Sequence, residues 1–332
     1  MATLLAIESS CDDTSAAVIS NGVVLSNVVV TQEDHKQYGG VVPEVASRQH
    51  NNNIVLAVEK ALEISKIKKS ALDAIAVTQG PGLLGSLLVG VSFAKGLALA
   101  LDKPLIAVHH MHAHILAHFI EDPKPKFPFI CLTVSGGHSQ LVIVHSPINM
   151  EVVGQTIDDA AGEAFDKAGK MFGLTYPAGP IIDKLAQHGE PIHPFAIAQI
   201  PDFNFSFSGF KTSVLYYIQK ATTKQHDFVE KNLNDLCASV QYTIIKTLEQ
   251  KLLKLIKKSK INEIAIAGGV AANKGLRNRL TELSKLHNFT LYIPKLEYCT
   301  DNAAMVAIAA NYKYIERLFS DQDLTPDPRL PF

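Results

Sequence analysis

The sequence predicts an α/β fold of two lobes, because one order of strands and helices occurs twice along the chain. In each half, three strands rich in β-branched and apolar residues come first, and helices then alternate with further strands. A chain of 332 residues with 47% hydrophobic and 19% charged residues is long enough for about two domains with cores of their own. We therefore expect two βββαβαβα-type lobes with a cleft between them.

The first copy opens with three successive strands, separated by the polar turn SSCDDT and by Asn21-Gly22. A helix with Pro43 at its start follows, and then strand, helix and strand alternate. Residues 74–94 carry no charge, but Gly80-Pro81-Gly82 interrupts them near the front, so we expect a strand, a loop and a helix rather than a membrane span. The expected strands are 4–8, 16–20, 23–30, 74–78 and 104–108, and the expected helices are 43–65 and 83–101.

The second copy has the same order of elements and carries an insertion after its third strand. Residues 158 to about 223 form this insertion, which we expect to be mostly helical with Gly and Pro joints. The predicted domains are a first lobe of residues 1–125, completed by the C-terminal helix at about 301–320, and a second lobe of residues 126–300. The expected strands are 129–134, 140–145, 151–156, 263–267 and 290–293, and the expected helices are 228–258, 272–286 and 301–317.

Composition narrows the function classes. The net charge is −1, so any affinity for nucleic acid must come from a local patch or a partner. The densest basic run, residues 251–260, favours a solvated lysine face, and we find no aromatic-basic stripe of the kind that grips RNA. The four cysteines are far apart and form no CxxC pair, which argues against a zinc knuckle or a disulfide scaffold and fits a reducing cytoplasm. Acidic residues follow the N-terminal apolar run too soon for a secretion signal.

Five histidines between His109 and His118 indicate a binding site. On a helix, His110 and His114 project from one face, as two imidazoles do when they share a metal ion, and His118 would extend the row. The HExxH zinc signature has a glutamate after its first histidine, but Met111 stands there, which disfavours a thermolysin-like peptidase. For an isolated HxxxH pair, packed histidines remain the more common explanation.

The first hairpin turn of each copy consists of small, polar or glycine residues, SSCDD from Ser9 and SGGH from Ser135. Backbone N–H groups in such turns can cradle an anion, although each turn alone could be an ordinary hairpin. The strand IAIA ends in Gly268-Gly269 and enters a helix, where Asn273 could bind a ribose or base or cap the helix. Asp301 could likewise be only a helix N-cap, and the carboxylates of DDAAGEAFDK could form a cluster or be solvated.

The order of elements is that of the actin-like fold of sugar kinases and chaperone ATPases. The motifs also resemble, over nearly the whole chain and in order, those of the tRNA adenosine threonylcarbamoyltransferase family, TsaD, formerly described as O-sialoglycoprotein endopeptidases. The motifs that carry this resemblance are IESSCDDTSAAV, YGGVVPEVASRQH, GPGLLGSLLVG, HHMHAH, VSGGHSQL, IDDAAGEAFDKAGKMFGL, FNFSFSGFKT, IAGGVAAN and CTDNAAM.

The resemblance implies one divalent metal ion, Fe²⁺ or Zn²⁺, held by His110, His114 and Asp301. His112 departs from the family, whose members usually have an acidic or polar residue there, but on a helix it points away from the His110 and His114 row. The substrate-binding positions that the resemblance implies are Thr133, Val134, Ser135, Gly136, Gly137, Asp166, Gly179, Asp183 and Asn273.

The implied reaction transfers threonylcarbamoyl from threonylcarbamoyl-AMP to N6 of the adenosine next to the anticodon, in tRNAs reading codons that begin with A. AMP leaves, and ATP and ADP are further candidates for the same cleft. The adenine amine must lose a proton, and we expect the carboxylate of Asp12 to accept it, with Glu8 in reserve.

The implied partners are tRNA, a TsaB paralogue and a TsaE ATPase, with the adenylate supplied by a TsaC or Sua-like synthase. We expect no membrane partner and a cytoplasmic location, and residues 83–101 offer helix faces for the paralogue. Two alternatives stay open, a metal-dependent hydrolase or peptidase and a non-catalytic actin-like nucleotide-binding regulator.

Overall fold

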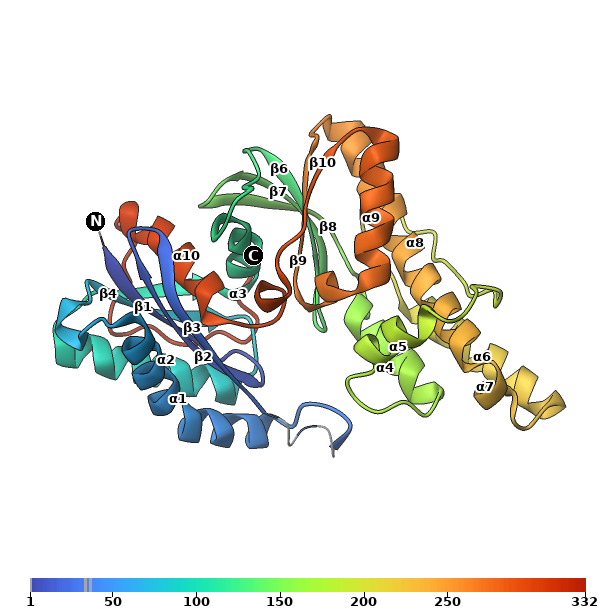
Figure 1. Ribbon diagram of the computed structural model, residues 1–332, viewed down its shortest axis with the longest axis horizontal. Coiled ribbons are helices and arrows are strands. Elements are labelled where there is room, and N and C mark those ends of the chain that lie inside the picture. The colour runs from blue at the N-terminus through green and yellow to red at the C-terminus, as the bar shows by residue number, and fades with distance from the viewer. Residues whose placement is uncertain (1, 33–34, 36–37) are drawn as a thin grey trace. The chain divides into compact units, whose positions relative to one another are not determined.

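The computed structural model describes residues 2–32, 35 and 38–332, and the chain divides into two compact units. Unit 1 comprises Met1–Lys124 and Pro294–Phe332, and unit 2 comprises Pro125–Ile293. Each unit contains one five-stranded mixed sheet with helices packed on it, which confirms the α/β prediction (Figure 1).

The sheet of unit 1 has the strand order β3-β2-β1-β4-β5. Its first three strands form the predicted antiparallel meander, and the last two run parallel to the central strand β1. Every residue of β1 after the first is buried, as expected for a strand covered on both faces. The strands are β1 (Thr3–Glu8), β2 (Asp13–Ser20), β3 (Val23–Thr31), β4 (Ala74–Gly80) and β5 (Leu105–His109).

Helices α1 and α2 pack together and against the sheet of unit 1, while α10 packs against its strands β1 and β2 (Figure 1). The core on the α1 and α2 side joins Leu5 and Ile75 of the sheet to Val58 and Val91 of these helices. Each such fully buried aliphatic side chain contributes roughly 2 kcal/mol relative to exposure. The helical elements of unit 1 are α1 (Pro43–Ser65), η2 (Lys69–Ala71), α2 (Leu84–Leu101), α3 (His110–Leu116), η3 (Ala117–Phe119), η5 (Leu296–Tyr298) and α10 (Ala303–Ile315).

The sheet of unit 2 repeats the same topology, with the order β10-β9-β6-β7-β8. An antiparallel meander again comes first, and two strands again run parallel to its first strand. The predicted internal repeat is therefore confirmed. The strands are β6 (Phe129–Val134), β7 (Ser139–Ser146), β8 (Asn149–Gln155), β9 (Glu263–Ala267) and β10 (Thr290–Tyr292).

The insertion in unit 2 supplies three helices, but its residues between Gln187 and Phe207 form no helix. The single helix expected at residues 228–258 is broken at Asn232, which has φ −115° and ψ 17° and whose side-chain amide donates to Phe228 O. The helical elements of unit 2 are α4 (Ala161–Met171), α5 (Ala178–Ala186), α6 (Ser208–Lys224), α7 (Phe228–Lys231), α8 (Leu233–Ser259), η4 (Gly269–Ala272) and α9 (Lys274–His287).

The basic run on α8 is not simply solvated. Lys251 Nζ donates to the carbonyls of Ile200 and Asp202, and the ammonium groups of Lys254 and Lys258 lie 5.6 and 5.2 Å from the centre of the Phe203 ring. These lysines therefore hold the segment before α6 against α8.

Among the described helices, α2 is long and apolar enough to cross a membrane by length and composition alone. In unit 1 it lies on the sheet, where Val91, Ala94 and Ala98 join the hydrophobic core. Its composition is therefore explained in part by packing within the α/β unit.

Candidate metal centre and ligand cavity

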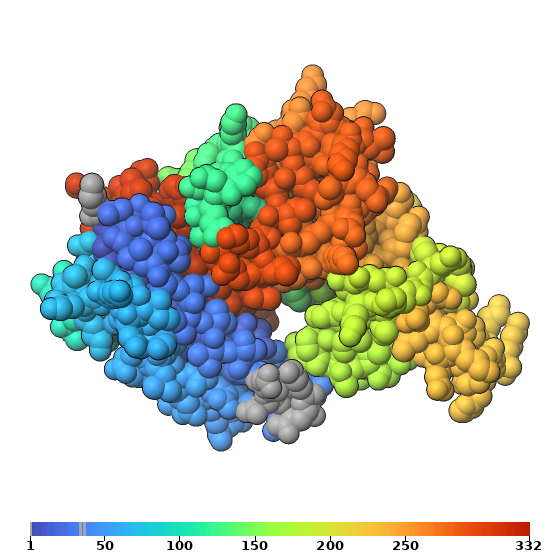
Figure 2. All heavy atoms as spheres, in the orientation of Figure 1, coloured from blue at the N-terminus to red at the C-terminus, as the bar shows by residue number. Residues whose placement is uncertain are grey.

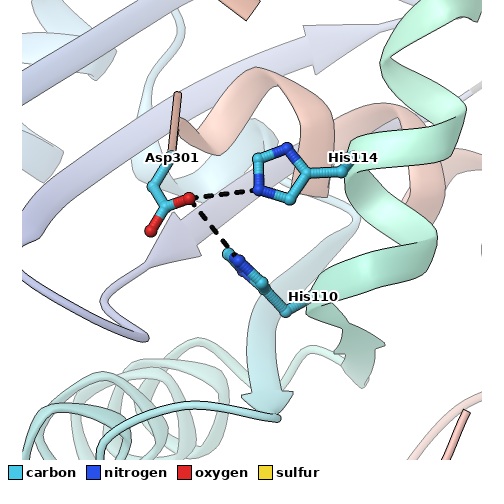
Figure 3. A group of neighbouring side chains, drawn as sticks. All are labelled: His110, His114 and Asp301. Carbon is cyan, nitrogen blue, oxygen red and sulfur yellow. Dashed lines mark hydrogen bonds and ion pairs between the residues drawn. The ribbon is translucent and has the colours of Figure 1, made fainter. Parts of the chain in front are cut away.

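His110, His114 and Asp301 come together in unit 1 with their ligand atoms within 4.8 Å of one another. The two histidines lie on α3, one turn apart, and Asp301 lies just before α10 (Figure 3). Asp301 Oδ1 is 3.1 Å from His114 Nε2 and 3.5 Å from His110 Nε2. The predicted spacing thus places both imidazoles toward one carboxylate.

Asp301 is not the N-cap of the last helix, although its position in the sequence was compatible with that role. Helix α10 begins at Ala303, and the side chain of Asn302 accepts from Met305 N as its N-cap. Because Asn302 caps the helix, the carboxylate of Asp301 is left to face the histidines.

Glu8 lies behind His110 at the end of β1 and is fully buried. Its Oε1 accepts from Ser10 N at 2.6 Å, and its Oε2 accepts from Thr78 Oγ1 at 2.6 Å and from His110 Nδ1 at 3.3 Å. A carboxylate only accepts hydrogen bonds, so Nδ1 carries a proton and Nε2 is the nitrogen that faces Asp301 and would bind a metal ion. Glu8 therefore fixes the tautomer and orientation of His110.

The carboxylates of Glu8 and Asp301 favour a positive charge at His110. Burial lowers the pKa of His110, but the carboxylates of Asp301 and Glu8 outweigh it and raise the pKa to about 9. Burial alone would raise the pKa of Glu8, whereas the charge and hydrogen bond of His110 bring it below its usual value. A proton or a metal ion between the two carboxylates would be stabilised.

The donor set fits a divalent transition metal. Two imidazole nitrogens and one carboxylate oxygen are common zinc and iron ligands, and three protein ligands leave coordination positions free. His118 lies on η3, outside this group, so it does not extend the row. His112 points elsewhere, as expected, because its ring packs 4.5 Å from those of His109 and Phe332.

Two carboxylates follow one another between β1 and β2. Asp12 is half-buried in the turn, and Asp13 begins β2. Burial and then the charge of Asp301 raise the pKa of Asp13 to about 7. From the sequence, Asp13 was only a residue of the SSCDD turn, since its environment depends on Asp301 from the other end of the chain.

A cavity of about 300 Å³ lies in unit 2 and contains five of the nine predicted substrate-binding residues. Thr133, Val134, Ser135 and Gly137 are not among the residues that line it. Phe165, Tyr176 and Val270 line it without having been predicted. The predicted residues in its wall are Gly136, Asp166, Gly179, Asp183 and Asn273.

The polar side chains of the cavity also hold its walls in place. Asp166 Oδ1 accepts from Ala178 N at 2.8 Å and from Gly179 N at 3.3 Å, so it caps the start of α5. Burial raises the pKa of Asp166, although these two hydrogen bonds oppose the shift. The neighbouring Asp158 instead accepts from Phe207 N at 2.7 Å and from Ser206.

Asp183 and Asn273 converge on α9. Asp183 accepts from Lys274 N and Gly275 N at 2.9 and 3.1 Å, and Asn273 Oδ1 accepts from Leu276 N at 2.8 Å. Asn273 is therefore an N-cap as well as a cavity residue. Gln241 of α8, which the sequence did not single out, donates to Asp183 at 2.6 Å and to Asn273 at 3.2 Å.

Glycines let backbone segments meet beside this cavity. A Cβ on Gly162 would lie 2.8 Å from Gly136 Cα, and a Cβ on Gly268, which has φ +87°, would lie 2.4 Å from Val134 O. Gly136 itself has open space and does not adopt a positive φ. The backbone at Gly136 is thus free to approach a ligand.

The repeated topology of the two units is that of a protein with the actin-like fold. Solved structures with this fold include the ROK hexokinase of Thermus thermophilus, at 16% identity and a TM-score of 0.51 over 95% of this chain and 99% of that one. HypF of T. kodakarensis has the same fold, with 14% identity and a TM-score of 0.65. The match covers 97% of this chain and 49% of the HypF chain.

The chain belongs to the TsaD family, tRNA N6-adenosine threonylcarbamoyltransferase, whose model matches residues 23–308. Curated relatives of that name include the proteins of Cytophaga hutchinsonii, 56% identical over 99% of this chain and 96% of the relative, and of Christiangramia forsetii, 55% identical over 99% and 98%. The resemblance that the motifs indicated is confirmed.

Proposed function

We propose that this chain transfers the threonylcarbamoyl group from threonylcarbamoyl-AMP to N6 of the adenosine next to the anticodon, in tRNAs that read codons beginning with A. The new bond joins N6 to the carbamoyl carbon, the bond from that carbon to the phosphate oxygen breaks, and AMP leaves. The observation that carries the proposal is the His110, His114 and Asp301 group in a chain that aligns almost end to end with relatives of that name.

His110 Nε2, His114 Nε2 and Asp301 Oδ1 would hold one Fe²⁺ or Zn²⁺ ion. When bound, such an ion supplies Lewis acidity, which polarises a carbonyl and offsets charge on phosphate. Glu8 keeps His110 in the tautomer that binding requires. Because Glu8 is fully buried, it serves better as a positioning residue than as the reserve base.

The attacking adenine amine loses a proton as the new bond forms. We propose Asp12 as its acceptor, since that carboxylate is half-exposed in the turn beside the candidate metal group. Asp13 is the second candidate, because it follows Asp12 directly and lies close enough to Asp301 to be affected by its charge. The single-turnover rates of the Asp12→Asn and Asp13→Asn variants, each compared with wild type, identify the base. A wild-type rate in both variants would exclude both carboxylates.

The cavity of unit 2 is the proposed site of the adenylate, and Gly136→Val tests it. A Cβ at Gly136 meets no atom within 4 Å, so the variant should fold, while the larger side chain takes up space in a cavity of about 300 Å³. We expect affinity for AMP, measured by calorimetry, to fall at least roughly tenfold, the equivalent of about 1.4 kcal/mol. Gly209→Val, also in open space but outside the cavity, is the control. Unchanged AMP affinity in the Gly136 variant would place the adenylate elsewhere.

Exposed apolar residues on α1 and α2 support a paralogue partner of the TsaB type. Leu56 on α1 is exposed, as are Leu84, Leu88 and Leu99 on α2, and Leu99 is 71% exposed. Apolar faces of two adjacent helices are suited to packing against helices of a related protein. A TsaE ATPase and a TsaC or Sua-like synthase complete the proposed set, acting with the chain in the cytoplasm.

Reconstitution tests both the activity and the partner. With threonylcarbamoyl-AMP and tRNA, we expect multiple-turnover modification only after addition of the paralogue, and Leu99→Glu should reduce that stimulation by putting a charge into an apolar contact. Mass spectrometry of the tRNA detects the product. Full turnover by the isolated chain would refute the need for the paralogue. Peptide cleavage without tRNA modification would favour the hydrolase, and nucleotide binding with neither activity would favour the regulator.

A further inference from the structure

The outer face of α6 in unit 2 has a row of RNA-compatible side chains. Thr212, Tyr216, Lys220 and Lys224 follow one another at intervals of four residues and are all exposed. Residues spaced in this way lie on one side of a helix. Tyr216 is 65% exposed, more than any other Phe or Tyr in the described part of the chain. An exposed aromatic ring beside lysines is the combination that binds single-stranded nucleic acid.

The opposite face of α6 fixes the helix to the rest of unit 2. Phe210, Val214 and Ile218 are buried, and the Tyr217 hydroxyl lies 2.8 Å from Nδ1 of the buried His193. The N-terminus is held by Asp158, which accepts from Phe207 N and Ser208 N at 2.7 and 3.3 Å. The exposed row therefore stands on an anchored helix, which lies at the surface in Figure 2, coloured yellow.

Local charge favours a polyanion at this face. From Phe203 to His226 the chain has three lysines, Lys211, Lys220 and Lys224, and no Asp, Glu or Arg. Their backbones make helix hydrogen bonds, but no side-chain ammonium group of the three makes a hydrogen bond or ion pair with another residue that the structure describes. The α8 lysines differ, because Lys251 is occupied by the carbonyls of Ile200 and Asp202. The α6 lysines thus remain available for phosphate contacts.

We infer that the outer face of α6 binds the tRNA substrate, with Lys220 and Lys224 on backbone phosphates and Tyr216 stacked on an unpaired base. This inference rests on the proposed function, which makes a tRNA the substrate. It also corrects the expectation that the chain has no aromatic-basic stripe. The spacing is present in the sequence, but only the fold shows which side of the helix is exposed.

The test measures binding of an unmodified tRNA transcript to the full-length chain with its proposed paralogue, by fluorescence anisotropy across a series of salt concentrations. Lys220→Ala combined with Lys224→Ala should lower the slope of log K against log salt by about 1.5, since each lost phosphate contact removes roughly 0.7 to 0.9. Tyr216→Ala should weaken binding by roughly fivefold to a hundredfold, as the loss of one stacked base does, and Tyr216→Phe should restore it.

Lys257→Ala combined with Lys285→Ala is the matched control, because it removes two exposed charges from unit 2 away from α6. The control should retain the wild-type slope, and AMP affinity should stay unchanged in every variant. An unchanged slope in the α6 double variant, or an equal loss in the control, overturns the inference. Modified adenosine is measured in the same preparations by mass spectrometry, and its absence with wild-type protein overturns the proposed function instead.

Discussion

Replacing His114 by alanine should leave the protein folded but without bound metal. Its Nε2 lies 3.1 Å from Asp301 Oδ1, and the substitution leaves one imidazole and one carboxylate as ligands. We expect metal affinity to fall at least roughly a hundredfold, because each protein ligand of a three-ligand site contributes a large part of the binding free energy. Elemental analysis of the purified variant measures the metal content, and threonylcarbamoyl transfer should fall with it.

His118→Gln is the control for this experiment. His118 is buried on η3 in the same histidine-rich segment but lies outside the His110, His114 and Asp301 group. It should keep the metal content of the wild type, even if the substitution lowers stability. Stoichiometric metal in the His114 variant would show that the three side chains are only a buried hydrogen-bonded cluster.

Glu8→Gln should weaken metal binding without removing any of the three proposed ligands. Glutamine has nearly the same shape, so it can still accept from Ser10 N or Thr78 Oγ1, but it lacks the negative charge that holds the proton on His110 Nδ1. Loss of a carboxylate that orients a metal-binding histidine typically costs 10- to 100-fold in affinity, and we expect an effect of roughly that size. Competition with a chelator measures it.

A second buried glutamate provides the comparison. Glu249 lies in unit 2, where Arg279 and Lys246 hold its pKa below the usual value against the effect of burial. Glu249→Gln removes a buried charge far along the chain, so it should change unfolding in urea but not metal affinity. If Glu8→Gln and wild type bind metal equally well, Glu8 merely supports the end of β1.

The sequence predicted those elements whose bounds are set by residues within or next to the element itself. The bounds of α1, β6 and β9 follow from runs of apolar residues and from Pro43, and they agree with the expected ranges. The pairing of His110 with His114 is equally local, since it depends only on helical spacing. The break between α7 and α8 was missed because a polar side chain in a favourable helical pattern gives no clear signal.

Site residues that depend on contacts between distant parts of the chain could not be found from local patterns. Asp301 is 187 positions from His114, so residue spacing could not join them, and the family resemblance alone suggested the pair. Whether the carboxylate of Asp301 could face the histidines depended on Asn302 taking the N-cap position of α10. Gln241 gave no signal at all, because its role exists only where α8 passes both Asp183 and Asn273.

Because the topology is repeated, the ends of β1 and β4 in unit 1 correspond to the ends of β6 and β9 in unit 2. Ile7 pairs with Val77 in unit 1, and Thr133 pairs with Ala267 in unit 2. The next positions are Glu8 and Thr78 in one copy, joined by a hydrogen bond of 2.6 Å. In the other copy they are Val134 and Gly268, and a Cβ on Gly268 would lie 2.4 Å from Val134 O.

An ancestral duplication would explain this difference. Each copy retained its own hydrophobic core, so substitutions at the strand ends of one copy did not endanger the folding of the other. One copy could therefore acquire a carboxylate and a hydroxyl group at this position, while the other has a valine and a glycine there. The two pairs, Glu8 with Thr78 and Val134 with Gly268, are therefore not interchangeable, although the strands that carry them are equivalent.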